Sequence, residues 1–368
     1  MCAGESRTAD VRDSGDSLRF TARWRTPFMV NPFIQQIIRS ESLSRYLLDA
    51  RDPDRLYAEV LAQGLAPALY LLNRGSRILP DPIAKLAQDA YRDALLFKDL
   101  CLCKLMEMSA ALAACGRVVV IKGLALCEKI YAEPEVRPMA DVDLYFPDGS
   151  IADVRSILMH YGFAPYGSYA NEFFLESLHV DIHEDLWGIR RNPLRRHIVS
   201  GIAESFVPST LVPGFFIPSP QLLAAHAAFH SLKHGLSRKI WFMDLYRLRR
   251  AGYFDTYAGG NAPLFVSCVL DYLDRLGLGG ETDPRRSKTR QLRFQLISMV
   301  LAGGTTHPVG ELALALLCPS PLQMFAYLKT SLVPRKQILK EMYGNDSYWR
   351  LLARRLAELA GRGKGAST

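Results

Sequence analysis

The sequence predicts an α+β protein in which a small mixed β-sheet lies between an N-terminal helical region and a C-terminal helical domain. Apolar residues recur at helical spacing over residues 25–116 and again over 219–360. Residues 117–187 instead alternate apolar and polar side chains in short runs, which is typical of strands. A chain of 368 residues is long enough for two domains or one large one.

Three segments outside these regions look irregular. Residues 1–24 and 361–368 lack periodicity, so we expect them to be disordered tails. Residues 188–218 are rich in Arg and Pro and are expected to form a linker. Its arginines could bind phosphate groups or lie on a solvated surface: Arg190, Arg191, Arg195 and Arg196.

The N-terminal region is predicted to end in a long helix from about Ile83 to Ala114, stopped by Gly116. This helix carries an apolar stripe with a period near 3.6: Leu95, Leu96, Leu100, Leu105, Met106 and Leu112. Two interpretations stay open. The N-terminal helices are either a packing platform or one wall of a cleft for a substrate.

The mixed region begins with a strand over residues 118–121, followed by a turn at Lys122 and Gly123 and a helix from about Leu124. Such a turn directs backbone N–H groups and the positive end of a helix towards an anion. A second helix is expected over residues 151–160, and residues 172–175 could pair with the strand that holds Asp181.

Carboxylates mark two further strands. Asp141 and Asp143 alternate with Val142 and Leu144, so both carboxylates should lie on one face of a strand, roughly 7 Å apart at the backbone. Like charges at that spacing are costly without a cation, and Mg²⁺ suits oxygen ligands combined with phosphates. Asp181 lies on the later strand and could complete a cluster able to hold two metal ions.

These pieces resemble the polymerase-β type of nucleotidyltransferase, and more closely the family of uncharacterised nucleotidyltransferases. The similarity runs over most of residues 30–355. Its specific motifs are the central ones: Lys122-Gly123-x-Ala125-Leu126, Tyr131, Arg137-Pro138-Met139-x-Asp141-x-Asp143-Leu144, Gly162-Phe163 and Val180-Asp181-x-His183. A later set extends the similarity: His226, His230, Lys233-His234, Trp241 and Asp244-Leu245. Better-known members carry Gly-Gly or Gly-Ser where this chain has Lys122 and Gly123.

The resemblance implies transfer of a nucleoside monophosphate from a nucleoside triphosphate to a hydroxyl or similar acceptor on a small molecule, sugar or peptide. Asp141, Asp143 and Asp181 would be the catalytic residues and would hold Mg²⁺ or Mn²⁺, while Lys122, Gly123 and Arg137 would bind the phosphates. The alternative is an inactive nucleotide-binding or scaffolding protein with the same fold. An interaction protein that works through its helical flanks is a third hypothesis.

Several histidines have more than one interpretation. His183 shares a strand face with Asp181 and could orient it or simply pack. His226, His230 and His234 are spaced by four residues, with Trp241 and Asp244 following. They could contact phosphate or acceptor, form hydrogen bonds in the core, or bind zinc with a further ligand.

Composition narrows the setting. The net charge of +8 suits an anionic substrate, but no compact basic tract with interleaved aromatic residues favours nucleic acid as a partner. Seven cysteines without a Cys-x-x-Cys pair indicate neither a disulfide framework nor a zinc site. We found no apolar core of a signal peptide and no span long enough for a membrane, so we expect a cytoplasmic protein.

Overall fold

The computed structural model describes residues 31–43, 52–132, 135–166, 171–189, 195–257 and 262–279, together with 296–297, 300, 307–318, 320–334, 336, 339–340 and 346–359. The expected tails at 1–24 and 361–368 lie outside the described residues, as do Arg190 and Arg191.

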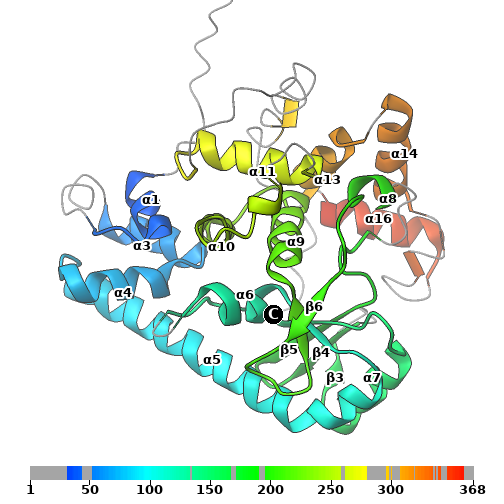
Figure 1. Ribbon diagram of the computed structural model, residues 1–368, viewed down its shortest axis with the longest axis horizontal. Helices are drawn as coiled ribbons and strands as arrows, with labels where there is room; N and C mark the ends of the chain where they lie inside the picture. Colours follow the sequence, from blue (N-terminus) through cyan, green and yellow to red (C-terminus); the bar gives the residue numbers. More distant parts are fainter. Residues whose placement is uncertain are drawn as a thin grey trace, which may run out of the picture.

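A mixed sheet occupies one side of the molecule (Figure 1). Its strands are β1 (Val119–Ile121), β2 (Val142–Tyr145), β3 (Ala164–Pro165), β4 (Glu172–Leu175), β5 (Leu178–His183), β6 (Phe206–Pro208) and β7 (Phe216–Pro218). They lie in the order β3-β4-β5-β2-β1-β7-β6. The central strands β2 and β5 are parallel, whereas β1 pairs antiparallel with β2, and β4 antiparallel with β5. The predicted mixed sheet is therefore confirmed, including the pairing of residues 172–175 with the strand of Asp181.

The segment expected to be a linker differs from that expectation, because it contributes two strands to the sheet. Strand β7 pairs in parallel with β1, where Val119 lies opposite Phe216, and β6 extends this edge in an antiparallel direction. Two of the prolines that suggested a linker, Pro208 and Pro218, occupy the last positions of these short strands. Proline is tolerated at strand ends and sheet edges because no ladder hydrogen bond is lost there.

Helices surround the sheet on the remaining sides (Figure 1). Before β1 they are α1 (Pro32–Arg39), α3 (Pro53–Ala62), α4 (Ala66–Ser76) and α5 (Asp81–Ala114). Among the strands are α6 (Lys122–Ile130), α7 (Ile151–His160) and α8 (Arg195–Ile198). After β7 they are α9 (Pro220–Lys233), α10 (Lys239–Arg250), the short 3₁₀ turn η1 (Asp255–Tyr257), α11 (Leu264–Arg275), α13 (His307–Leu316), α14 (Pro321–Leu332) and α16 (Tyr348–Leu359). In the part of the chain that the structure describes, no helix has the length and apolar character needed to cross a membrane.

The long helix α5 confirms the predicted element but corrects its apolar stripe. Leu105 and Leu112 are buried as expected, whereas Leu96 and Met106 are exposed by 69% and 46%. The buried face instead runs through Ile83, Ala87, Ala94, Cys101, Leu105, Met108 and Leu112. The prediction overlooked small residues such as Ala87 and Ala94, because it took large apolar side chains to be the buried ones. The position of a residue around the helix determines whether it is buried. This face packs on α3, α4, α7 and β5.

One continuous apolar core joins the N-terminal helices, the sheet and the C-terminal helices. Helix α9 lies inside it and is buried nearly all round, and it contacts α6, α10, α11, α13 and β7. Helix α6 in turn packs on β1 and β2. Helix α6 therefore covers β1 and β2, while α9 packs on α6 and β7, and both helices line the pocket that Asp143 of β2 also lines.

Candidate functional site

The turn between β1 and α6 has an unusual backbone. Lys122 adopts φ +51°, in the left-handed region that favours glycine, and it begins α6 directly after Ile121. At Gly123 the constraint is space, because a Cβ atom there would lie 2.8 Å from both Cγ and Sδ of Met139. It would also lie 3.2 Å from Nη1 of Arg137. The side chains of Arg137 and Met139 thus pack directly on Gly123, and any larger residue there would have to displace them.

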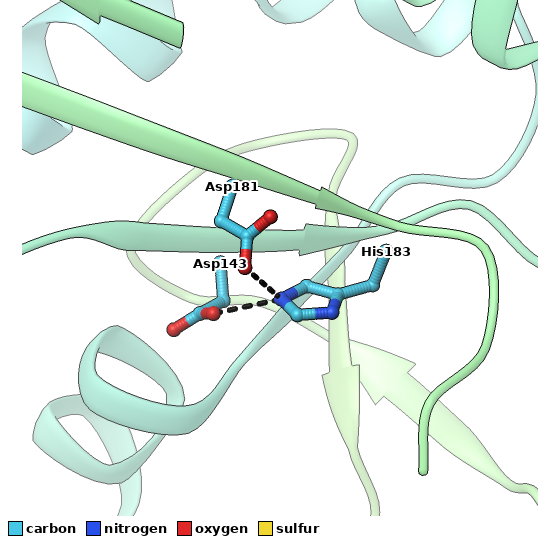
Figure 2. Close-up of side chains that lie close together, drawn as sticks. All are labelled: Asp143, Asp181 and His183. Atoms are coloured by element: carbon cyan, nitrogen blue, oxygen red, sulfur yellow. Dashed lines mark hydrogen bonds and ion pairs between the residues drawn. The ribbon is translucent and has the colours of Figure 1, made fainter. Parts of the chain in front are cut away.

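Strand pairing brings two of the predicted carboxylates together. Asp143 of β2 lies opposite Asp181 of the parallel strand β5, although 38 residues separate them in the chain. Figure 2 shows both carboxylates converging on one nitrogen of His183, which lies two residues further along β5. The His183 Nε2 atom is 2.8 Å from Asp143 Oδ1 and 3.0 Å from Asp181 Oδ2. His183 therefore connects the two aspartates, so its ring does more than pack.

A second cation reaches the same cluster from the turn. The Lys122 Nζ atom lies 2.5 Å from Asp143 Oδ1 and 3.4 Å from His183 Nε2. Burial would raise the pKa of Asp143, but Lys122 and His183 outweigh it and hold that pKa well below its ordinary value. Burial lowers the pKa of Lys122, and the carboxylates of Asp143 and Asp181 more than offset this, so its pKa is raised. Asp143 is thus a carboxylate that stays ionised although it is only 3% exposed.

Asp141 stands slightly apart. It precedes β2 and lines the same pocket as Asp143. Its pKa is raised, first by burial and then by the charge of Asp143. Within the described residues, the compact group whose ligand atoms all lie within 4.8 Å of one another consists of Asp143, Asp181 and His183. The structure therefore brings together two of the three predicted aspartates with a histidine, and Asp141 lies beside this group.

Glu172 was missed by the sequence analysis. It lies opposite Asp181 in the β4–β5 ladder, so the two side chains share a face of the sheet. Burial, followed by the charges of Asp181 and Asp141, raises its pKa to about 7. The expected pairing of residues 172–175 with the Asp181 strand contained this signal, but the register was needed to place Glu172 opposite Asp181.

Arg137 is held by a buried ion pair. Its Nε atom donates to both oxygens of Asp244, each at 3.0 Å, and Nη1 donates to the carbonyl of Pro138 at 3.3 Å. Tyr131 donates to Asp244 as well, at 2.6 Å, and burial raises the pKa of this phenol well above its ordinary value. The Nε donor of Arg137 is therefore used in the bond to Asp244, while the side chain still lines the pocket.

A pocket of about 230 Å³ opens next to Asp143. Lys122, Gly123, Arg137 and Asp141 form one side, and residues of α9 and α10 form the other: Leu223, His226, Ala227, His230, Ser231, Ile240, Trp241 and Asp244. Gly64, between α3 and α4, also reaches this pocket. The N-terminal helices thus pack against the core, and the loop between α3 and α4 also contributes to the wall of the pocket.

The three spaced histidines have different environments. His226 is buried and bonds to the Leu186 carbonyl at 2.9 Å, and burial lowers its pKa to about 3. His230 lines the pocket with its ring 5.3 Å from that of Trp241, and burial followed by the charge of Lys122 lowers its pKa well below the ordinary value. The His234 ring packs 5.8 Å from Trp241, outside the residues that line the pocket. The helical row therefore places two residues at the pocket wall, His226 and His230, and the first of them is also hydrogen-bonded in the core.

The group of Asp143, Asp181 and His183 could hold a divalent metal ion. Two carboxylate oxygens and an imidazole nitrogen are donors that Mn²⁺ accepts, and the carboxylates also suit Mg²⁺. Ligand atoms within 4.8 Å of one another can contact a common ion at about 2.0–2.2 Å after small side-chain movements. The donors present therefore fit a hard divalent cation.

Comparison with known proteins agrees with this geometry. A family model described as "Uncharacterised nucleotidyltransferase" matches residues 49–278, which include the turn, the acidic group and the pocket. No curated protein and no solved structure matches the chain. The match covers more than half of the 368 residues and confirms the resemblance seen in the motifs. The chain belongs to the family of uncharacterised nucleotidyltransferases.

Proposed function

We propose that this protein transfers a nucleoside monophosphate from a nucleoside triphosphate to a hydroxyl or similar acceptor on a small molecule, sugar or peptide, with Mg²⁺ or Mn²⁺. The observation that supports this most directly is the convergence of Asp143, Asp181 and His183 next to the turn at Lys122 and Gly123 and next to a pocket. Membership of the family supports nucleotidyl transfer in general.

Each residue then has a chemical role. Asp143 and Asp181 would hold the metal, with Asp141 at the side of the pocket as a further carboxylate. A divalent ion bound there would lower the pKa of the acceptor hydroxyl and neutralise charge on the triphosphate. The backbone N–H groups at the start of α6, together with Lys122 and the free donors of Arg137, would bind the phosphates.

The reaction is a displacement at the α-phosphorus. The acceptor oxygen forms a bond to this phosphorus, the bond to the bridging oxygen of the β-phosphate breaks, and pyrophosphate leaves. The acceptor proton passes to the Asp181 carboxylate or to water. Asp181 suits this role better than Asp143, because its side chain is 26% exposed whereas that of Asp143 is 3% exposed.

The first test is pyrophosphate release from each of the four nucleoside triphosphates with Mg²⁺ or Mn²⁺. We expect Asp143→Asn and Asp181→Asn to lower the rate by at least about a hundredfold, since both remove a metal-binding charge. Asp148→Asn is the matched control. Asp148 follows β2, but its side chain is 63% exposed and its ion pair with Arg117 is long, at 3.9 Å. Equal rates in Asp143→Asn and the wild type would refute the proposed site.

A nucleotide-binding protein without transfer activity is the second candidate. It is favoured by the ion pair between Lys122 and Asp143, in which the ammonium group neutralises one of the proposed metal ligands. Metal-dependent nucleotide binding that is lost in Asp143→Asn, without pyrophosphate release for any nucleotide and acceptor tried, would support this candidate over the enzyme.

A further inference from the structure

The Lys122 ammonium group lies where a metal ion would have to bind. Its Nζ atom is 2.5 Å from Asp143 Oδ1 and 3.4 Å from His183 Nε2, and both residues belong to the group able to hold a metal. A metal ion would lie about 2.0–2.2 Å from its oxygen and nitrogen ligands. The ammonium group and such an ion would therefore compete for the Asp143 carboxylate and repel each other as like charges at short distance.

The backbone shows that this arrangement is built into the turn. Lys122 has φ +51°, which side chains with a Cβ atom rarely adopt, and it directs the side chain back across the sheet towards Asp143. Asp143 is 3% exposed, so without a cation its charge would be buried and uncompensated. The ion pair stabilises a backbone conformation that would otherwise favour glycine.

The Lys122 side chain also has space into which it can move. Lys122 is 22% exposed and lines the pocket next to Gly123 and Arg137, where the proposed triphosphate would bind. A lysine side chain has four flexible carbon–carbon links and can leave an ion pair without backbone movement. The Lys122 side chain could therefore reach either the Asp143 carboxylate or the phosphates of the proposed nucleotide.

We infer that Lys122 is an internal counter-ion that occupies the cation position of the free protein and exchanges with the divalent ion. When the ion binds to Asp143 and Asp181, the ammonium group moves into the pocket and faces the phosphates. This inference rests on the proposed metal site and adds a step to it. Metal affinity is then set by exchange against Lys122 as well as by the ligands.

The first experiment measures Mn²⁺ binding by electron paramagnetic resonance and calorimetry, without nucleotide. Lys122→Gly suits the left-handed backbone, and Lys122→Gln keeps side-chain length without charge. Both variants should bind Mn²⁺ at least about tenfold more tightly than the wild type, because no charge-assisted hydrogen bond has to be broken. Lys122→Arg keeps a cation and should bind no more tightly than the wild type, while Asp143→Asn should abolish binding and so locate the ion.

The second experiment follows the lysine itself by its rate of acetylation, read by mass spectrometry in the wild-type protein. Mn²⁺ should raise the rate at Lys122, because the ammonium group leaves Asp143. The rate at Lys85 should not change, since that side chain is 74% exposed on α5 and pairs with Asp89.

The outcomes separate this inference from the proposed function. Equal or weaker Mn²⁺ binding in both neutral variants, or an unchanged acetylation rate at Lys122, would overturn the exchange while leaving the metal site intact. No Mn²⁺ binding by the wild type or by any variant would overturn both.

Discussion

Asp244 provides the sharpest test of how the pocket is built. It is 2% exposed and accepts hydrogen bonds from Tyr131 at 2.6 Å and from Arg137 Nε at 3.0 Å to each oxygen. Asp244→Asn keeps the shape and one acceptor oxygen but removes the charge, which leaves the buried guanidinium of Arg137 without its counter-ion. Breaking a buried ion pair from one side costs about 3–5 kcal/mol. We expect the lower end, about 3 kcal/mol of unfolding free energy, because the amide oxygen still accepts one bond.

Urea unfolding followed by circular dichroism measures this cost from the shift of the midpoint at constant slope. Asp148→Asn is again the control, since an exposed pair at 3.9 Å contributes at most about 1 kcal/mol. The double variant Arg137→Met with Asp244→Leu removes both charges and should recover at least half of the loss. A change of less than about 1 kcal/mol in Asp244→Asn would refute the view that this ion pair holds Arg137 in position.

The other predictions concern His226 and Gly123. Burial holds the pKa of His226 at about 3 against 6.5 ordinarily, so the unfolded chain binds a proton between these values that the folded protein does not. The free energy of unfolding should therefore fall as pH drops below 6.5, by up to about 1.4 kcal/mol per pH unit from this residue. His226→Gln should make urea unfolding less dependent on pH between pH 6.5 and 4.5. An unchanged slope of unfolding free energy against pH would contradict this. Gly123→Ala should cost about 1–3 kcal/mol of unfolding free energy through contact with Met139, and Met139→Ala should restore part of it. If the double variant is no more stable than Gly123→Ala, another contact limits the turn.

Much of the local structure follows from the sequence because its causes are local. Alternation of Val142 and Leu144 with Asp141 and Asp143 predicts a strand with carboxylates on one face, and β2 spans Val142–Tyr145. The predicted helix at 151–160 has the bounds that the structure gives. The period of a strand or helix determines which side chains share one face and can be buried together. This pattern depends only on residues that are close in the sequence.

The linker expectation shows the limit of that reasoning. Strands of three residues, such as Phe206–Pro208 and Phe216–Pro218, are too short for a periodic signal. Phe216 becomes part of a strand because β1 lies beside it, about a hundred residues earlier in the chain. A partner strand supplied by the tertiary structure decides such cases.

The same division applies to the site. The sequence by itself predicted which side chains would form the candidate site, since Lys122, Asp141, Asp143 and Asp181 all stand in recognisable local patterns. Only the tertiary structure decided how they meet. Strand register set Asp181 between Asp143 and Glu172. Packing of the β1–α6 turn placed Lys122 against Asp143, and packing of α10 paired Asp244 with Arg137 across 107 residues. Such contacts depend on packing between distant segments, which leaves no periodic trace in the residues around either partner.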